Sequence, residues 1–106
     1  MDTPRTLSRN EAIAIVRRYK QVISSRYETA PKVIMYGSYA KGYATPLSDI
    51  DVAVIVPKIE DGKWLDWSQE LVHDGHEVND LIEPVLLEEH EGSILYDDVM
   101  RTGVSV

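Results

Sequence analysis

Two aspartates near the middle of the chain, Asp49 and Asp51, have the spacing of a metal-binding pair. They stand two positions apart and open an apolar run, Val52 to Val56. Residues at i and i+2 of a strand point to the same face, so the two carboxylates would lie side by side. Adjacent carboxylates repel one another and attract a hard divalent cation such as Mg²⁺. The spacing therefore predicts a metal site at the start of a strand.

A turn upstream of the aspartates has the residues of an anion-binding site. Gly37 and Ser38 follow the apolar run Val33 to Tyr36, and Lys41 comes shortly after them. Glycine lets the backbone approach a bound group closely, and the N–H groups of such a turn can bind phosphate oxygens. The ammonium group of lysine suits a phosphate as a point charge. A phosphate-binding turn beside metal-binding acids is typical of sites that act on a nucleoside triphosphate.

Helices and strands are expected to alternate along the chain. Apolar residues recur at three- and four-residue steps in the helical segments, and short β-branched runs between them are typical of strands. Ser8 and Glu11 have capping-box spacing and mark the start of the first helix. In order, we predict a helix at 9–28, a strand at 32–36, a helical turn at 39–41, a strand at 49–56, a helix beginning at Trp64, a strand at 78–87, a helix after Ser93 and a short strand at 104–106.

Glycine and proline set several of the expected boundaries. Gly75 is expected to end the helix that begins at Trp64, and Gly103 to follow the last helix in the left-handed conformation. Pro84 cannot donate a ladder hydrogen bond, so its strand should lie at a sheet edge or carry a bulge. This order of elements predicts an α/β or α+β domain in which helices flank a small mixed β-sheet. The expected apolar positions of the last helix are Ile94, Leu95, Val99 and Met100.

Length and charge limit the class of protein. The 106 residues are expected to form one domain, 1–106, with residues 1–7 as a flexible tail. The chain has no cysteine, which excludes disulfides and cysteine-based metal sites. Its 18 acidic residues outnumber 11 basic ones, for a net charge of -7, so binding to long nucleic acid through phosphates is not expected. Because no signal peptide or membrane span is visible, we expect a soluble, cytoplasmic protein with no membrane partner.

The pattern Gly37-Ser38 followed by Asp49-Ile50-Asp51 resembles the signature of the DNA polymerase beta-like nucleotidyltransferase superfamily. Within it, the chain is most similar to the minimal nucleotidyltransferases of bacteria and archaea. The resemblance implies a nucleotidyltransferase fold and an enzyme that transfers a nucleotidyl group, AMP from ATP or another NTP, to a hydroxyl acceptor. It also implies two Mg²⁺ ions held by three acids. The stretches that carry it are Val33 to Gly42, Ser48 to Val54, and Ile82 to Leu87.

The resemblance also implies a protein partner. Many minimal nucleotidyltransferases are the antitoxin halves of pairs with a HEPN-domain toxin, and in that relationship the enzyme adds AMP to a tyrosine of the toxin. A HEPN-type toxin is therefore the implied partner, and a homodimer is the alternative. The acceptor stays open at this point among a tyrosine, an RNA end and a small molecule.

The third acid of the implied metal site has two candidates. Glu83 lies within the apolar strand at 78–87 and matches the family by position, whereas Asp80 lies at the start of that strand. The two are three positions apart, so a regular strand would point them to opposite faces. The family often has Asp here, and Glu is one methylene longer. The implied catalytic and metal-binding residues are Asp49, Asp51 and Glu83, and the implied nucleotide-binding residues are Gly37, Ser38 and Lys41.

Two non-catalytic functions are the alternatives. The chain could act as an antitoxin or binding module that neutralises a partner by contact, or as a sensor that binds an NTP without turnover. A chain of this length leaves no room for an acceptor-binding domain, so the acceptor surface would come from another chain. Aromatic side chains expected at the surface are candidate interface anchors: Tyr39, Tyr43, Trp64 and Trp67.

Overall fold

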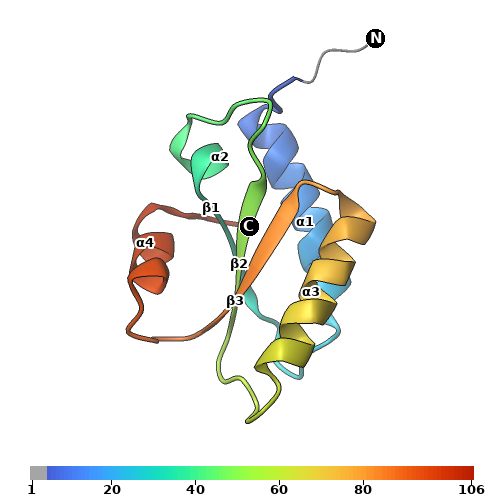
Figure 1. The fold of residues 1–106 in the computed structure, drawn as a ribbon, viewed down its shortest axis with the longest axis vertical. Helices are drawn as coiled ribbons and strands as arrows, with labels where there is room; N and C mark the ends of the chain where they lie inside the picture. The colour runs from blue at the N-terminus through green and yellow to red at the C-terminus, as the bar shows by residue number, and fades with distance from the viewer. Residues whose placement is uncertain (1–4) are drawn as a thin grey trace.

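The computed structural model describes residues 5–106, in which helices and strands alternate as predicted (Figure 1). None of the helices within this described range has the length and apolar character needed to cross a membrane. The elements are α1 (Arg9–Ser24), β1 (Lys32–Tyr36), α2 (Ser38–Lys41), β2 (Ile50–Val56), α3 (Trp64–Val78), β3 (Ile82–Glu88), α4 (Ile94–Thr102) and β4 (Val104–Ser105).

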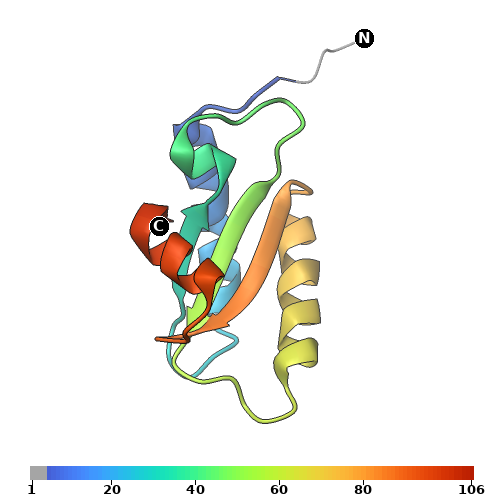
Figure 2. The same cartoon turned by 60° about the vertical axis from the view of Figure 1, so that its left-hand side comes forward.

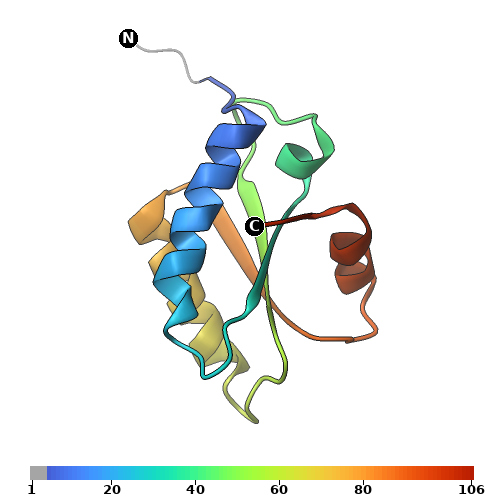
Figure 3. The ribbon, with the colours of Figure 1, turned by 180° about the vertical axis from the view of Figure 1, so that it is seen from behind.

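The four strands form one mixed sheet in the order β3-β2-β1-β4. Strand β1 runs antiparallel to β2 and β4, whereas β2 and β3 are parallel. Helices α1 and α3 lie side by side on one face of the sheet, as Figure 3 shows from behind. Helix α4 lies on the opposite face (Figure 2). The predicted small mixed sheet with flanking helices is therefore confirmed.

The central strand β2 divides the core into two clusters. Val52, Val54 and Val56 point to the face covered by α1 and α3, and all three are buried. Ala53 and Ile55 are buried on the other face, against Tyr96 and Val99 of α4. An apolar run buried on both faces is typical of a strand between two helical layers. The predicted central strand is confirmed, and its alternation fixes which face each side chain occupies.

Strand β3 lies at the edge of the sheet, as Pro84 predicts. The Ile50 N–H donates to Leu81 O at 2.7 Å, and the Glu89 N–H donates to Val56 O at 2.9 Å. These two bonds set the parallel register. The backbone N–H and C=O groups of the odd-numbered residues of β3 therefore point toward β2, and those of the even-numbered residues point away from the sheet. Pro84 therefore occupies an outward position, where its missing N–H breaks no ladder bond.

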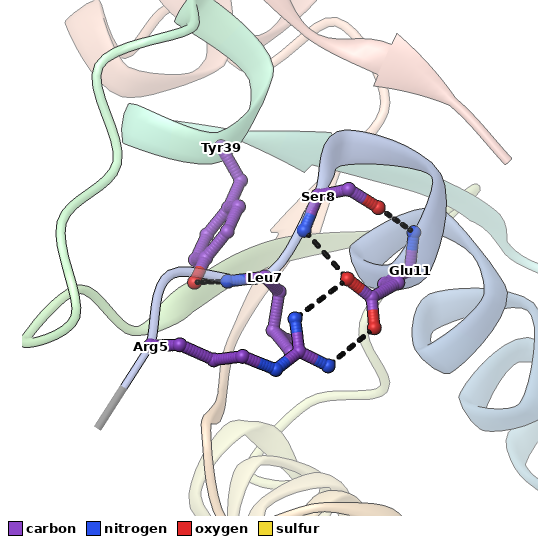
Figure 4. Close-up of polar contacts among 5 residues, drawn as sticks. All are labelled: Arg5, Leu7, Ser8, Glu11 and Tyr39. Atoms are coloured by element: carbon purple, nitrogen blue, oxygen red, sulfur yellow. Dashed lines mark hydrogen bonds and ion pairs between the residues drawn. The ribbon is translucent and has the colours of Figure 1, made fainter. Parts of the chain in front are cut away.

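A capping box begins α1, as the spacing predicts (Figure 4). The Glu11 N–H donates to Ser8 Oγ at 3.0 Å, and the Ser8 N–H donates to Glu11 Oε1 at 2.9 Å. Arg5 donates to both Glu11 oxygens, at 3.0 and 2.7 Å. The hydrogen bond from Arg5, with that from the Ser8 backbone, lowers the pKa of Glu11 to about 2.

The segment before α1 contacts α2. The Leu7 N–H donates to the Tyr39 hydroxyl at 3.4 Å (Figure 4), and the Leu7 side chain packs against the core. Of the predicted tail 1–7, residues 1–4 lie outside the described residues, whereas Arg5 and Leu7 make the contacts given above. Tyr39 itself is only 4% exposed, so its predicted role as a surface anchor is wrong.

The other three aromatic candidates differ in exposure. Tyr43 and Trp64 are 61% and 54% exposed, as expected of surface side chains. Trp67 is only partly buried and packs edge-on against Tyr27, with ring centroids 5.2 Å apart. It therefore contributes to the core rather than standing free at the surface.

Two helices end at different residues from those predicted. Helix α1 ends at Ser24 rather than at residue 28, because the Arg26 N–H closes a tight turn on Ile23 O at 3.0 Å. Helix α3 continues through Gly75 to Val78, so the prediction that Gly75 ends it is wrong. A Cβ at Gly75 would lie 3.0 Å from Ile82 Cγ2. The glycine thus allows α3 to pack closely on β3.

Helix α4 and the residue after it also differ from the predictions. The helix buries Tyr96 and Val99, whereas Ile94 and Met100 are 90% and 46% exposed. Leu95 is also exposed, so only Val99 of the expected apolar positions is buried. Gly103 is extended, with φ -76° and ψ 166°, and not left-handed.

Gly103 is explained by close packing instead of by backbone conformation. A Cβ at this position would overlap Ile34 Cγ2 on β1. The Gly103 N–H donates to Val99 O at 2.8 Å, at the end of α4. The chain then enters β4, which pairs with β1 and confirms the predicted short final strand. The glycine therefore allows the end of α4 to touch the sheet.

We predict that Gly103→Ala lowers the free energy of unfolding by about 1–3 kcal/mol, because the added methyl group overpacks the contact with β1. The φ and ψ of Gly103 suit alanine, so the loss would be steric. Gly92→Ala is the matched control, since a Cβ there meets nothing within 4 Å, and it should change stability by no more than about 1 kcal/mol. Urea unfolding measures both, and equal stability of the two variants would refute the packing role.

Candidate active site

The two aspartates lie where β2 begins. Asp49 directly precedes the strand and is exposed, and Asp51 is half-buried within it. The strand begins at Ile50, one position later than predicted. Ile50 and Val52 are fully buried on the face of α1 and α3. Because side chains alternate along a strand, Asp51 must point to the opposite face.

Asp51 stands in a row of polar side chains across three strands. Its pairing partner on β1 is Tyr36, and its partner on β3 is Glu83. Partners on adjacent strands point to the same face, so these side chains are neighbours. We call Tyr36, Asp51 and Glu83 the polar row. It occupies the sheet face that α4 covers further along β2, where Ala53 lies.

The turn after β1 lies directly against Asp51. Gly37 has φ +73°, a conformation that residues with side chains rarely adopt. A Cβ on Gly37 would overlap the Asp51 carboxylate at Oδ2. The glycine is therefore required twice, for the turn and for the close approach of a carboxylate. The predicted juxtaposition of the Gly37-Ser38 turn with Asp51 is present in the fold.

The acids act on one another electrostatically. The pKa of Asp51 is raised from its usual value of 3.8 by burial first, and then by the charges of Asp49 and Glu83. The pKa of Tyr36 is raised by burial and then by Asp51 and Glu83. A carboxylate beside two others gains by binding a cation, because the cation removes both the repulsion and part of the desolvation cost.

Of the two candidates for the third acid, Glu83 stands beside Asp51. Glu83 is exposed on the edge strand and belongs to the polar row. Asp80 lies in the turn before β3, where Asn79 accepts hydrogen bonds from the N–H groups of Leu81 and Ile82. The parallel register thus brings Glu83, and not Asp80, into the row.

The donor set fits Mg²⁺ held jointly with a nucleotide. Asp49, Asp51 and Glu83 supply oxygen atoms alone, which a hard cation prefers. Within residues 5–106, no group of three His, Cys, Asp or Glu side chains stands close enough to enclose an ion by itself. Mg²⁺ usually binds one or two carboxylates together with substrate phosphates and keeps several waters. A site with carboxylates on one side and open surface on the other suits that mode.

The predicted nucleotide-binding residues lie in and around α2. Ser38 is the first residue of this short helix, and its carbonyl accepts from the N–H groups of Gly42 and Tyr43 at 2.9 and 3.1 Å. The first N–H groups of any helix lack intrahelical partners, which leaves them available to a phosphate. Lys41 ends α2, and its Nζ lies 3.4 Å from Asp98 Oδ2 on α4. Lys41 is therefore engaged by another helix and not by the acids of the polar row.

Tyr36 and Asp98 are neighbours of the candidate site residues that the sequence analysis does not identify. Tyr36 stands there only as the end of an apolar run, although alternation from the buried Met35 predicts that it points to the other face. Its neighbours Asp51 and Glu83 depend on strand register, which the local sequence does not contain. Asp98 lies 57 positions from Lys41, and no local pattern connects the two.

Comparisons with known proteins find a matching family model and solved structures of similar fold. The family model for the nucleotidyltransferase domain matches residues 16–98. A protein from Sulfolobus solfataricus, assigned as a nucleotidyltransferase, has a similar structure, with a TM-score of 0.68 and 19% identity over 98% of this chain and 90% of that one. A mutant of the toxin–antitoxin MntA-HpeT is also similar, with a TM-score of 0.58 and 24% identity over 95% of this chain and 72% of that one. A search of curated proteins gives no match.

We predict that Asp51→Asn stabilises the metal-free protein at pH 7. An acid whose pKa is raised on folding destabilises the folded state once it ionises, so this cost is absent below pH 3.8 and appears as the pH rises. The gain should stay below about 1 kcal/mol, because solvent screens partly exposed charges. Thermal unfolding at pH 7 and pH 3 measures it.

The control for this experiment is Asp61→Asn, which removes the same charge from an exposed turn and should have a smaller effect. Addition of Mg²⁺ should raise the unfolding temperature of the wild type more than that of Asp51→Asn. A less stable Asp51→Asn at pH 7 would contradict the repulsion among these acids.

Proposed function

The chain belongs to the nucleotidyltransferase domain family, and from this premise we propose that it transfers AMP from ATP to a hydroxyl acceptor with the aid of Mg²⁺. The observation that carries the proposal is the polar row. Asp51 stands between the Gly37 turn and Glu83, with Asp49 two positions before it. A nucleotide whose phosphates occupy the turn would lie beside all three acids. We further propose that residues 1–106 act as one domain.

The acids have distinct tasks in this proposal. Asp49, Asp51 and Glu83 would hold Mg²⁺, which when bound neutralises the triphosphate and stabilises charge on the attacking and leaving oxygens. Glu83 would also accept the proton of the acceptor hydroxyl, since it is exposed at the sheet edge where an acceptor can approach. The acceptor oxygen then bonds to the α-phosphorus as the bond to pyrophosphate breaks.

The turn and α2 would hold the nucleotide in place. Gly37 leaves space beside the Asp51 carboxylate, and the Ser38 hydroxyl and the first N–H groups of α2 can donate to phosphate oxygens. Lys41 would supply a positive charge one helical turn away, since its own N–H donates to Gly37 O at 2.9 Å. These contacts would bind the phosphates and would give little specificity for the base.

We propose that the acceptor is a tyrosine of a partner protein, a HEPN-type toxin. The support is the resemblance of this chain to the minimal nucleotidyltransferases, together with the similar fold of a chain from the toxin–antitoxin MntA-HpeT. Asp49 and Glu83 are exposed, and Glu83 lies on the edge strand, so a second protein can approach the acids from that side. A homodimer, in which the acceptor belongs to another copy, is the alternative that the same experiment distinguishes.

We predict that Asp49→Asn, Asp51→Asn and Glu83→Gln each reduce AMP transfer by on the order of 100-fold or more, the usual cost of losing a group that stabilises transition-state charge. The measurement is incorporation of label from ATP labelled at the α-phosphate into the purified HEPN-type partner, with Mg²⁺ present. Asp80→Asn is the matched control, since Asp80 lies outside the polar row, and it should keep nearly the wild-type rate.

The outcomes separate the candidate functions. Label on the protein itself would favour self-modification within a homodimer. Tight binding of ATP without pyrophosphate release would favour a nucleotide sensor, and protection from the toxin without ATP would favour a binding module. Wild-type rates for both Asp49→Asn and Asp51→Asn would refute the proposed mechanism.

A further inference from the structure

Lys41, at the end of α2, forms an ion pair with Asp98, which lies 57 positions later in the chain. Its Nζ lies 3.4 Å from Asp98 Oδ2 in the middle of α4. Both side chains are partly shielded, with 33% and 29% of their surfaces exposed. The ion pair therefore connects α2, which follows the turn proposed to bind phosphates, to α4, which covers the polar-row face of the sheet.

Asp98 is itself fixed in position. Its other carboxylate oxygen, Oδ1, accepts from Arg101 Nη2 at 3.1 Å. Its carbonyl accepts from the Thr102 hydroxyl at 2.8 Å. The next residue, Val99, is fully buried against the sheet. The carboxylate thus has a defined direction, with one oxygen on Arg101 and the other on Lys41.

We propose that Asp98 is a positioning residue, which orients the Lys41 ammonium toward the phosphates of the bound nucleotide. The proposal rests on the function proposed above. The Lys41 backbone lies one helical turn from Gly37, since its N–H donates to Gly37 O, so the lysine belongs to the short helix that follows the turn proposed to bind the phosphates. An ammonium group has three donors, and a bond to Asp98 leaves two for phosphate oxygens.

The physical gain is pre-organisation. A free lysine side chain has many rotamers and loses that freedom when it binds a phosphate. Asp98 restricts the rotamers before the nucleotide arrives, so less entropy is lost on binding. The Asp98 charge also repels phosphates, but solvent and salt screen this longer-range effect between partly exposed groups more than they weaken the direct contact. The net effect of Asp98 should therefore be tighter binding.

The test is the dissociation constant of the full-length protein for Mg–ATP and for Mg–tripolyphosphate, measured by calorimetry. Asp98→Asn should weaken both by the same factor, about 3- to 10-fold, because the lost pre-organisation concerns phosphates and not the base. Asp98→Glu should restore much of the affinity. In a Lys41→Ala background, Asp98→Asn should have no further effect, since the residue would act through Lys41.

Asp97→Asn is the matched control. It removes the same charge from the neighbouring position of α4, which is exposed, and it should bind both probes as the wild type does. Thermal unfolding of Asp98→Asn separates a role in stability from one in binding, because a merely structural role would lower the unfolding temperature and leave the affinity of the folded protein for both probes unchanged.

Three results would overturn the role of Asp98 while leaving the proposed function intact. These are wild-type or tighter binding by Asp98→Asn, equal losses for Asp97→Asn and Asp98→Asn, and a full effect of Asp98→Asn without Lys41. If the wild type binds neither probe, the proposed function itself fails, and the role of Asp98 falls with it.

Discussion

The antiparallel pairing of β1 with β2 is the constraint on which the rest of the structure depends. It sets Tyr36, the last residue of β1, opposite Asp51. The next residue, Gly37, must then turn beside the Asp51 carboxylate. A slip of one residue would send Asp51 to the buried face with α1 and α3, where an unpaired carboxylate costs several kcal/mol. The register of this pairing therefore also fixes the site.

The acids lie at one end of the sheet, where their carboxylates avoid burial in its apolar core. Glu83 and Asp49 are exposed, and Asp51 is half-buried where β2 emerges from the core. Beyond Asp51 the same face is closed by α4, which packs on Ala53 and Ile55. The acids thus stay in contact with water at one end of the sheet, and the apolar clusters fill the remainder. Their mutual repulsion remains as a cost that a cation can remove.

Local patterns predicted much of this fold. The strand over 32–36 is bounded as predicted, because Pro31 and Gly37 flank a short β-branched run. The capping box at Ser8 and the edge position of Pro84 follow from chemistry within a few residues. The choice of Glu83 over Asp80 rests on the family resemblance, because alternation only predicts that the two point to opposite faces. The register of β3 against β2, which pairs Glu83 with Asp51, is not contained in the local sequence.

The errors involve contacts between distant segments. Gly75 and Gly103 were assigned to helix ends, yet each leaves room for a side chain from another element, Ile82 and Ile34. The buried face of α4 and the bond between Lys41 and Asp98 likewise depend on how α4 packs. A glycine pattern alone does not distinguish a helix end from a close approach.

The outward edge of β3 has a consequence for how the protein can associate. Its backbone donors are almost all occupied or missing: the Ile82 N–H bonds to Asn79 O, the Glu88 N–H bonds to Glu91 Oε1, and Pro84 has none. Within β3, only the N–H of Leu86 still points outward. An added strand needs a series of such donors, so this edge resists fibril-like stacking and sheet extension by a neighbouring chain. Contacts with other molecules must then be made by side chains and helices, which leaves the exposed Glu83 carboxylate of this strand accessible.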